Sequence, residues 1–366
     1  MAVPKFDESE MKPIGRIPAS GFLPEITLFN YPFSMRDAAV SLYDRQPAWQ
    51  LLGLEMKEFN PIIIPDNVAR GFVMEEQHID NFTQAGGLDM FGVEWEFVPA
   101  AMGSMEKPGM PHLFDDANDW PDVVQFPDVD SWDWEGNAKI NNGTYLTADT
   151  FNRMWIFTGY FERQRSFMGF EDASVAMIDE DQQDAVKALF ERLTDVYIDI
   201  VDHAIAVYEH LDGIYLHDDW GSAMDTFIAP EYTAEIIVPA MRRFTDYVKS
   251  RGLRAELHCC GCNYKNVPNM IAAGWEIWMP QSNVNDADAL YEAYGDKIVM
   301  AFLPEDFDPA NTSEEEQRQI ARDYVAKYCD PERPTLFSFV DGGKYLTSAF
   351  QEELYRASRL RYSQAV

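Results

Sequence analysis

The stretch Arg254-Ala-Glu-Leu-His-Cys-Cys-Gly-Cys262 reads as a buried strand that ends in a turn. It follows a helix-like stretch that ends at Gly252, as in an alternation of strands and helices. Side chains alternate faces along a strand, so we expect His258 and Cys260 to share a face and Cys259 to point away. Imidazole and thiolate are preferred zinc ligands, so this pair predicts half of a metal site. The alternative is a buried histidine beside small apolar cysteines.

The same alternation continues on both sides of this stretch. Short apolar runs predict strands, and amphipathic runs between them predict helices. The predicted strands are 60–65, 153–158, 213–217, 254–260, 275–280, 297–303 and 335–340. The predicted helices are 181–211, 230–252, 266–273, 287–294, 313–328 (capped near Thr312) and 350 onward. This pattern predicts an α/β protein, and its spacing favours a (β/α)8 barrel over an open sheet.

Two segments break the alternation. Residues 86–136 combine a hairpin pattern at 88–99 with an irregular Pro/Asp/Trp-rich loop at 107–136, and residues 1–45 read as an N-terminal extension. We predict one domain over residues 1–366, with the extension and the hairpin and loop as additions to the barrel.

Charge and cysteine usage exclude several classes of function. The formal net charge of −33 argues against nucleic acid or an anionic membrane as a partner. No run of about twenty apolar residues predicts a membrane span, and the first residues lack the pattern of a signal peptide. Three of the four cysteines crowd into 259–262, a poor disulfide framework that suits a reducing compartment. We therefore predict a cytoplasmic protein.

Polar side chains follow five of the predicted strands, where parallel barrels place their active sites. They are His217-Asp218-Asp219-Trp220-Gly221, His258 with Cys260, Gln281 with Asn283, Glu305 with Asp306, and Asp341. Solvent-facing loops of an acidic chain are acidic in any case, so a single such residue means little. Five strand ends together predict a site.

The order of these motifs is similar to that of the uroporphyrinogen decarboxylase superfamily. The matching strings are Phe161-Glu162, Gly169-Phe170-Glu171, Asp218-Asp219-Trp220-Gly221, Ala229-Pro230-Glu231-Tyr232, Pro239, His258-Cys259-Cys260-Gly261, Ala272-Ala-Gly-Trp-Glu276 with Gln281, and Tyr294-Gly-Asp-Lys297. The resemblance covers about residues 145–345 and implies a (β/α)8 barrel.

The superfamily contains two chemistries. True decarboxylases carry an Arg-Gln-Ala-Gly-Arg-Tyr type motif, whereas Asp44-Arg45-Gln46-Pro47-Ala48-Trp49 lacks its glycine and second arginine. The other branch comprises corrinoid-dependent methyltransferases, which bind zinc through His-x-Cys and a later cysteine. The resemblance implies that His258 and Cys260 are zinc ligands, and Asp341 stands near the position of the later cysteine. Asp341 or Glu305 is the candidate for the third ligand, and a metal-free site is the alternative.

The resemblance thus implies a corrinoid-dependent methyltransferase. Because members that activate a thiol have a cysteine-richer site, the missing third cysteine favours an O-demethylase, which moves a methyl group from a small methoxylated compound to the Co(I) corrinoid of a partner protein. The candidate catalytic residues are His258, Asp218, Asp219 and Glu305. The candidate substrate-binding residues are Trp220, Met168, Phe170, Gln281, Asn283 and Met279. A decarboxylase-like lyase is one alternative, and it would need Arg45, Arg70, Arg153 and Arg163 to cluster at the barrel mouth. A non-catalytic tetrapyrrole- or corrinoid-binding protein is the other.

Overall fold

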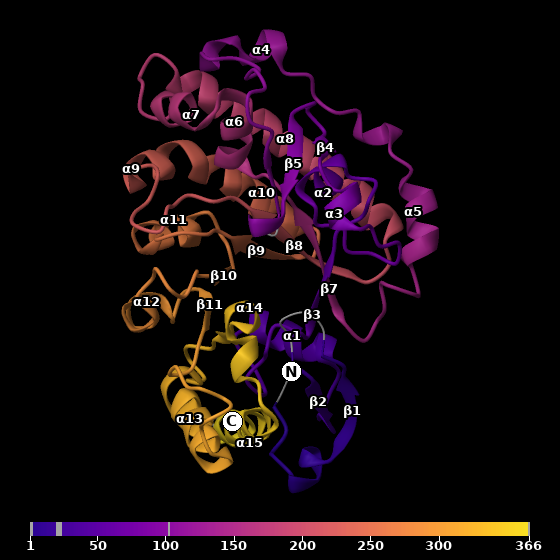
Figure 1. Ribbon diagram of the computed structural model, residues 1–366, viewed down its shortest axis with the longest axis vertical. Coiled ribbons are helices and arrows are strands. Elements are labelled where there is room, and N and C mark those ends of the chain that lie inside the picture. Colours follow the sequence, from indigo (N-terminus) through magenta and orange to yellow (C-terminus); the bar gives the residue numbers. More distant parts are fainter. Residues whose placement is uncertain (1–2, 20–23, 102, 365–366) are drawn as a thin grey trace. The chain divides into compact units, whose positions relative to one another are not determined.

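The computed structural model describes residues 3–19, 24–101 and 103–364 (Figure 1). The chain is an α/β protein, as predicted, and it divides into two compact units. Unit 1 comprises Met1–Lys57, Asp149–Phe151 and Glu276–Val366, and unit 2 comprises Glu58–Ala148 and Asn152–Trp275. Within the expected N-terminal extension, residues 1–2 and 20–23 lie outside the described residues. The single domain stays a prediction.

Unit 2 is built on three neighbouring parallel strands, β7 (Phe151–Ile156), β8 (Leu211–His217) and β9 (Arg254–His258). Parallel strands need a helical crossover, and α8 (Gln183–Val207) and α10 (Val238–Ser250) lie in these connections. Helix α10 packs against α8 and β9 (Figure 1). The register pairs His217 with His258, so the carboxyl ends of β8 and β9 lie side by side.

The remaining elements of unit 2 include a small antiparallel sheet. The other α-helices and strands of the unit are α2 (Pro65–Arg70), α3 (Asn81–Gln84), β4 (Gly87–Leu88), β5 (Glu94–Val98), β6 (Gly103–Glu106), α4 (Trp120–Val123), α5 (Trp134–Asn141), α6 (Tyr160–Met168), α7 (Phe170–Ala176), α9 (Pro230–Tyr232) and α11 (Val267–Ala272). Strands β4 and β5 form the predicted hairpin, and β6 adds a third strand that the sequence pattern did not predict. The loop at 107–136 contains only short helical turns before α5.

Unit 1 carries the parallel strands β10 (Ile277–Met279), β11 (Val299–Phe302) and β12 (Leu336–Phe337). Its other elements are β1 (Pro13–Ile17), β2 (Ile26–Phe29), α1 (Met35–Tyr43), the start of β3 (Met56–Phe59), α12 (Ala287–Tyr294), α13 (Glu314–Tyr328), α14 (Phe339–Gly342) and α15 (Ser348–Ser363). Helix α13 packs against α15 (Figure 1). It begins with a capping box between Ser313 and Glu316, so the cap lies one residue after the predicted Thr312.

Three predicted elements need correction. The strand predicted at 60–65 is wrong, because β3 ends at Phe59 and the two prolines of the segment cannot donate to a ladder. The strand predicted at 335–340 shortens to β12, since Gly342 N donates to Ser338 O and closes a helical turn. The helix predicted at 230–252 contains a π-helical segment, Thr233–Ile237, which ends two residues before Pro239, a residue without the amide hydrogen that a regular helix requires.

Candidate metal and substrate site in unit 2

Two histidines face each other at the carboxyl ends of β8 and β9. His217 and His258 occupy paired positions in the parallel register, and their rings stack with centroids 4.6 Å apart and an interplanar angle of 16°. Trp155, Phe157 and Tyr215 form an aromatic cluster whose members pack against one or both imidazoles. The aromatic cluster restricts ring rotation and keeps water away from one side of the pair.

His258 and Cys260 lie together as predicted, but β9 ends at His258, so Cys260 lies in the turn after the strand and not on the strand predicted at 254–260. Nε2 of His258 lies 3.0 Å from Sγ of Cys260, while Nδ1 lies 3.5 Å from the Tyr215 hydroxyl. Cys259, between them, is fully buried. The amide of Cys260 donates to Oδ1 of Asp219 at 2.6 Å, and this oxygen lies 4.0 Å from Nε2 of His258. Asp219 thus fixes the turn that carries the thiol.

His217 is a further site residue, to which the sequence pattern assigned no role. Its Nδ1 lies 2.5 Å from Oε2 of Glu162, a buried residue in the first turn of α6. Glu162 also lies near the guanidinium groups of Arg70, at 3.5 Å, and Arg165, at 3.7 Å. The signal available in the sequence was the placement of His217, which ends its strand just as His258 ends the next one.

The two histidines have opposite pKa shifts. Burial alone lowers the pKa of His217, but the charges of Glu162 and Asp219 outweigh it and raise the pKa. Burial and the nearby charge of His217 lower the pKa of His258 to about 4. Burial raises the pKa of Glu162, yet His217 and Arg70 outweigh this effect and the pKa is lowered. At neutral pH His258 is therefore a neutral imidazole with one ring-nitrogen lone pair available to a metal.

The donors of this site fit zinc. One ligand atom each from His217, Asp219 and His258 lies within 4.8 Å of the other two, and the thiol of Cys260 adjoins His258. Two imidazoles, a carboxylate and a thiol suit zinc, whereas magnesium and calcium prefer an all-oxygen set. Zinc bound at these residues would act as a Lewis acid.

Thr158, just after β7, has a left-handed backbone with φ of 62°, which is unusual for a β-branched residue. Its hydroxyl accepts a hydrogen bond from Arg70 at 3.0 Å, and its carbonyl accepts one from Tyr197 at 2.9 Å. Backbone strain of this kind is found at functional sites, where surrounding contacts maintain it. The strained residue follows β7, the strand that pairs with the His217 strand β8.

Asp218 is buried beneath the site. Its carboxylate accepts hydrogen bonds from the amides of Phe161 and Glu162, at 3.3 and 2.9 Å, and from Nε1 of Trp220 at 2.9 Å. Burial and the charge of Glu162 raise its pKa to about 7, although these donors act in the opposite direction. Asp218 thereby caps α6, which carries Glu162, and its predicted catalytic role stays a prediction.

We expect Asp218→Asn to destabilise the protein by about 2 kcal/mol. Both carboxylate oxygens of Asp218 accept hydrogen bonds from N–H groups, whereas asparagine turns an NH2 group toward one of these donors. Urea denaturation followed by circular dichroism measures the change. Asp225→Asn is the control, since Asp225 is exposed and pairs with exposed Lys265. Equal unfolding midpoints for Asp218→Asn and the wild type would remove the capping role.

The substrate residues predicted in unit 2 differ in exposure. Trp220 and Met168 are buried, and Trp220 is engaged with Asp218. Phe170 is 48% exposed and its ring packs against Phe227 at 4.9 Å. Phe170 is the one of the three that is open to contact a substrate.

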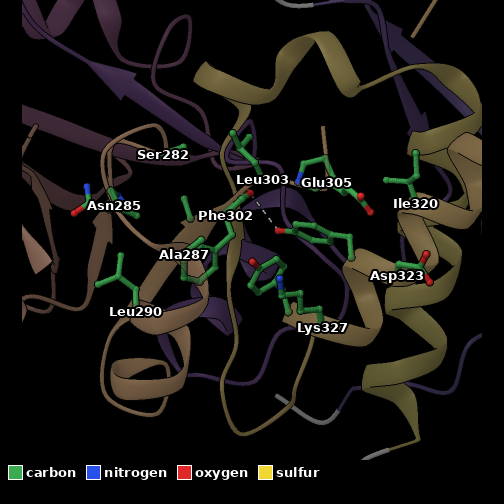
Figure 2. A pocket seen from close by; sticks show the side chains of 15 residues that line it. Ser282, Asn285, Ala287, Leu290, Phe302, Leu303, Glu305, Ile320, Asp323 and Lys327 are labelled. Atoms are coloured by element: carbon green, nitrogen blue, oxygen red, sulfur yellow. Dashed lines mark hydrogen bonds between the residues drawn. The ribbon is translucent and has the colours of Figure 1, made fainter. Parts of the chain in front are cut away.

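The other predicted site residues belong to unit 1. Glu305 is exposed and lines a pocket of about 380 Å³ between α12, β11 and α13 (Figure 2). Asp341 is exposed and accepts a hydrogen bond from Ser282 at 2.9 Å. Met279 packs against the apolar core of unit 1. Asn283 is exposed and Gln281 half-buried, in the loop after β10. Their roles in metal or substrate binding stay predictions.

The arginines that a decarboxylase would need are already paired. Arg163 is buried between Asp66 and Asp89, and Arg153 is buried against Glu256. Two further arginines face acceptors in their own units. Arg70 lies beside Glu162, and Arg45 donates to the carbonyls of Gly295 and Glu332. Each of the four therefore meets acceptors within its own unit.

Comparison with known protein families and with curated protein sequences gave no match. Among solved structures the chain is similar to Dispersin B, at 10% identity and a TM-score of 0.25, over 59% of this chain and 71% of that one. It is also similar to the spore cortex-lytic enzyme SleL of Bacillus megaterium QM B1551, at 12% identity and a TM-score of 0.27. That match covers 85% of this chain and 62% of SleL, less than two thirds of its length. Similarities of this size assign neither a fold nor an activity.

Across the described ranges, none of the helices combines the length and the apolar composition needed to cross a membrane.

Proposed function

We propose that the chain is a cytoplasmic (β/α)8 barrel of the uroporphyrinogen decarboxylase superfamily and a corrinoid-dependent methyltransferase. It acts as an O-demethylase, which moves a methyl group from a small methoxylated compound to the Co(I) corrinoid of a partner protein. The observation that carries the proposal is the approach of His258 Nε2 and Cys260 Sγ to 3.0 Å at the end of β9. This is the His-x-Cys pair that the resemblance assigns to zinc.

The local charge supports a metal-dependent reaction. Loss of the methyl group leaves negative charge on an oxygen, and Glu162 and Asp219 already place carboxylates beside the two histidines. An unassisted oxyanion is unfavourable there, and a bound zinc ion would stabilise it. His258 and Cys260 hold the metal, Asp219 fixes the turn of Cys260, and the aromatic cluster around Trp155 excludes water from one side.

The pairing of the arginines favours this function over a lyase. A decarboxylase of a polyanionic substrate needs cations that are open to carboxylates. Arg153 and Arg163 are buried against carboxylates of the chain itself, and Arg70 lies beside Glu162. The net charge of −33 acts in the same direction.

Metal content and turnover test the proposal together. We expect protein purified without a metal-affinity column to contain one zinc ion per chain and to methylate cob(I)alamin from a methoxylated aromatic compound, with activity lost on chelation and restored by zinc. Mass spectrometry measures the metal, and the cobalamin absorbance follows methyl transfer. Zinc-loaded protein that transfers no methyl group from any of a panel of methoxylated compounds would contradict the proposed activity.

The thiol of Cys260 is tested separately. Cys260→Ser should lose most of its zinc, because a hydroxyl is a far weaker zinc ligand than a thiolate. Cys262→Ser is the matched control, since it makes the same change in the same turn. Full zinc occupancy in Cys260→Ser would exclude Cys260 as a ligand.

A further inference from the structure

We propose, on the basis of the zinc-dependent function above, that His217 and Asp219 are metal ligands together with His258, with Cys260 at the fourth position. Glu162 positions His217. The metal site is then complete within unit 2 and does not use Asp341, which the resemblance placed near the missing cysteine.

The first support is the placement of the two imidazoles. His217 and His258 are paired across parallel strands, so their side chains leave the sheet in the same direction. One nitrogen of each, with one oxygen of Asp219, forms a group whose members all lie within 4.8 Å of one another. Two histidines and one carboxylate form a recurrent three-ligand set of catalytic metal sites, and zinc that also binds Cys260 can take a fifth ligand when a substrate enters.

The second support is the contact between His217 and Glu162. Because Nδ1 of His217 faces Oε2 of Glu162 at 2.5 Å, Nε2 is the nitrogen that remains to bind the metal. A metal-bound histidine usually donates its other ring N–H to a carboxylate, which fixes the ring and strengthens the ligand. Glu162 is buried and held near Arg70 and Arg165, so its carboxylate stays in place.

The position and exposure of Asp219 are the third support. Its Oδ1 accepts the amide of Cys260, and its side chain is 24% exposed beside His258, which is 21% exposed. The carboxylate therefore opens toward solvent on the side where a metal and a substrate would enter. One residue both fixes the cysteine turn and supplies an oxygen donor.

Metal binding without substrate tests this ligand set. Apoprotein is titrated with zinc in a calorimeter, and dissociation constants are compared. We expect His217→Ala and Asp219→Asn each to weaken zinc binding more than 100-fold, and Glu162→Gln to weaken it about 10- to 100-fold. His112→Ala is the control, because His112 is exposed and belongs to a separate group of possible ligands in unit 2, with exposed Asp115 and half-buried Asp172. Wild-type affinity in both His217→Ala and Asp219→Asn would overturn the inference, and so would loss of zinc in His112→Ala.

A measurement on the wild-type protein tests the ligand set even if one of the variants fails to fold. X-ray absorption spectroscopy of the zinc-loaded protein should show two imidazoles, one sulfur and oxygen; a single imidazole would overturn the inference. These outcomes are independent of turnover. A protein that binds zinc in this way but transfers no methyl group contradicts the proposed activity alone, whereas an active protein with unchanged affinity in His217→Ala and Asp219→Asn contradicts the ligand set alone.

Discussion

Arg163→Met should lower the free energy of unfolding by about 3–5 kcal/mol, the largest stability effect that we expect from one substitution in unit 2. The Arg163 guanidinium is fully buried, donates to Asp89 at 2.6 Å, and also contacts Asp66. It joins α6 to α2 and to the turn before β5. Methionine fills much of the volume but leaves two buried carboxylates without the guanidinium that contacts both of them.

The same change should make stability depend on pH. Burial and the charge of Asp89 already raise the pKa of Asp66 to about 6 while Arg163 is present to lower it. Without Arg163 the pKa of Asp66 rises further in the folded variant. In the unfolded chain Asp66 has its ordinary pKa of 3.8, so above that pH the folded variant keeps a proton that the unfolded chain has released. Unfolding free energy then falls as pH rises, and the deficit should be larger at pH 8 than at pH 5.

Urea denaturation at both pH values measures this effect. Arg242→Met is the control, because Arg242 forms an exposed pair with Asp246 on one helix and its loss should cost about 0.5 kcal/mol. A deficit below about 1 kcal/mol for Arg163→Met, or one that grows toward pH 5, would show that the buried pair does not stabilise unit 2.

His258→Ala should reduce methyl transfer at least about 100-fold, since Lewis-acid stabilisation supplies several kcal/mol and each 1.4 kcal/mol is worth tenfold in rate. The variant should remain folded, because His258 is partly exposed and its neighbour Cys260 stays attached to Asp219. Cobalamin absorbance follows the rate, and circular dichroism follows the fold.

His203→Ala is the control for His258→Ala. Its ring lies 2.9 Å from Asp130 and stacks on Trp134, in contacts that involve none of the proposed site residues. It should retain wild-type turnover. Activity within a few-fold of the wild type in His258→Ala would remove His258 from the mechanism.

The sequence predicted those parts of the site that depend on local geometry. Alternation along one strand predicted that His258 and Cys260 lie together, and they approach to 3.0 Å, although Cys260 lies in the turn after β9. Hydrophobic patterning within short segments also located α12 at its observed bounds and most of the strands. It was less accurate for β12 and β3, where prolines and a helical turn end the strand pattern.

Side chains brought together by different strands and helices were beyond this kind of prediction. Alternation within β8 says nothing about which residue of β9 lies opposite His217, because register is set by packing of the whole sheet. Glu162 precedes His217 by 55 positions and meets it only because Asp218 caps α6 beside the end of β8. The buried position of Asp218 likewise depends on that helix.

From sequence alone, then, came the α/β class, the order of strands and helices, and the His258–Cys260 pair, since each depends on the periodicity of neighbouring residues. Only the tertiary structure decided that His217, Glu162 and Asp219 surround this pair and that Arg153 and Arg163 are buried against carboxylates. The physical reason is that strand register and helix packing are set by the free energy of the whole chain. Contacts between residues far apart in the sequence are therefore not encoded in any one segment.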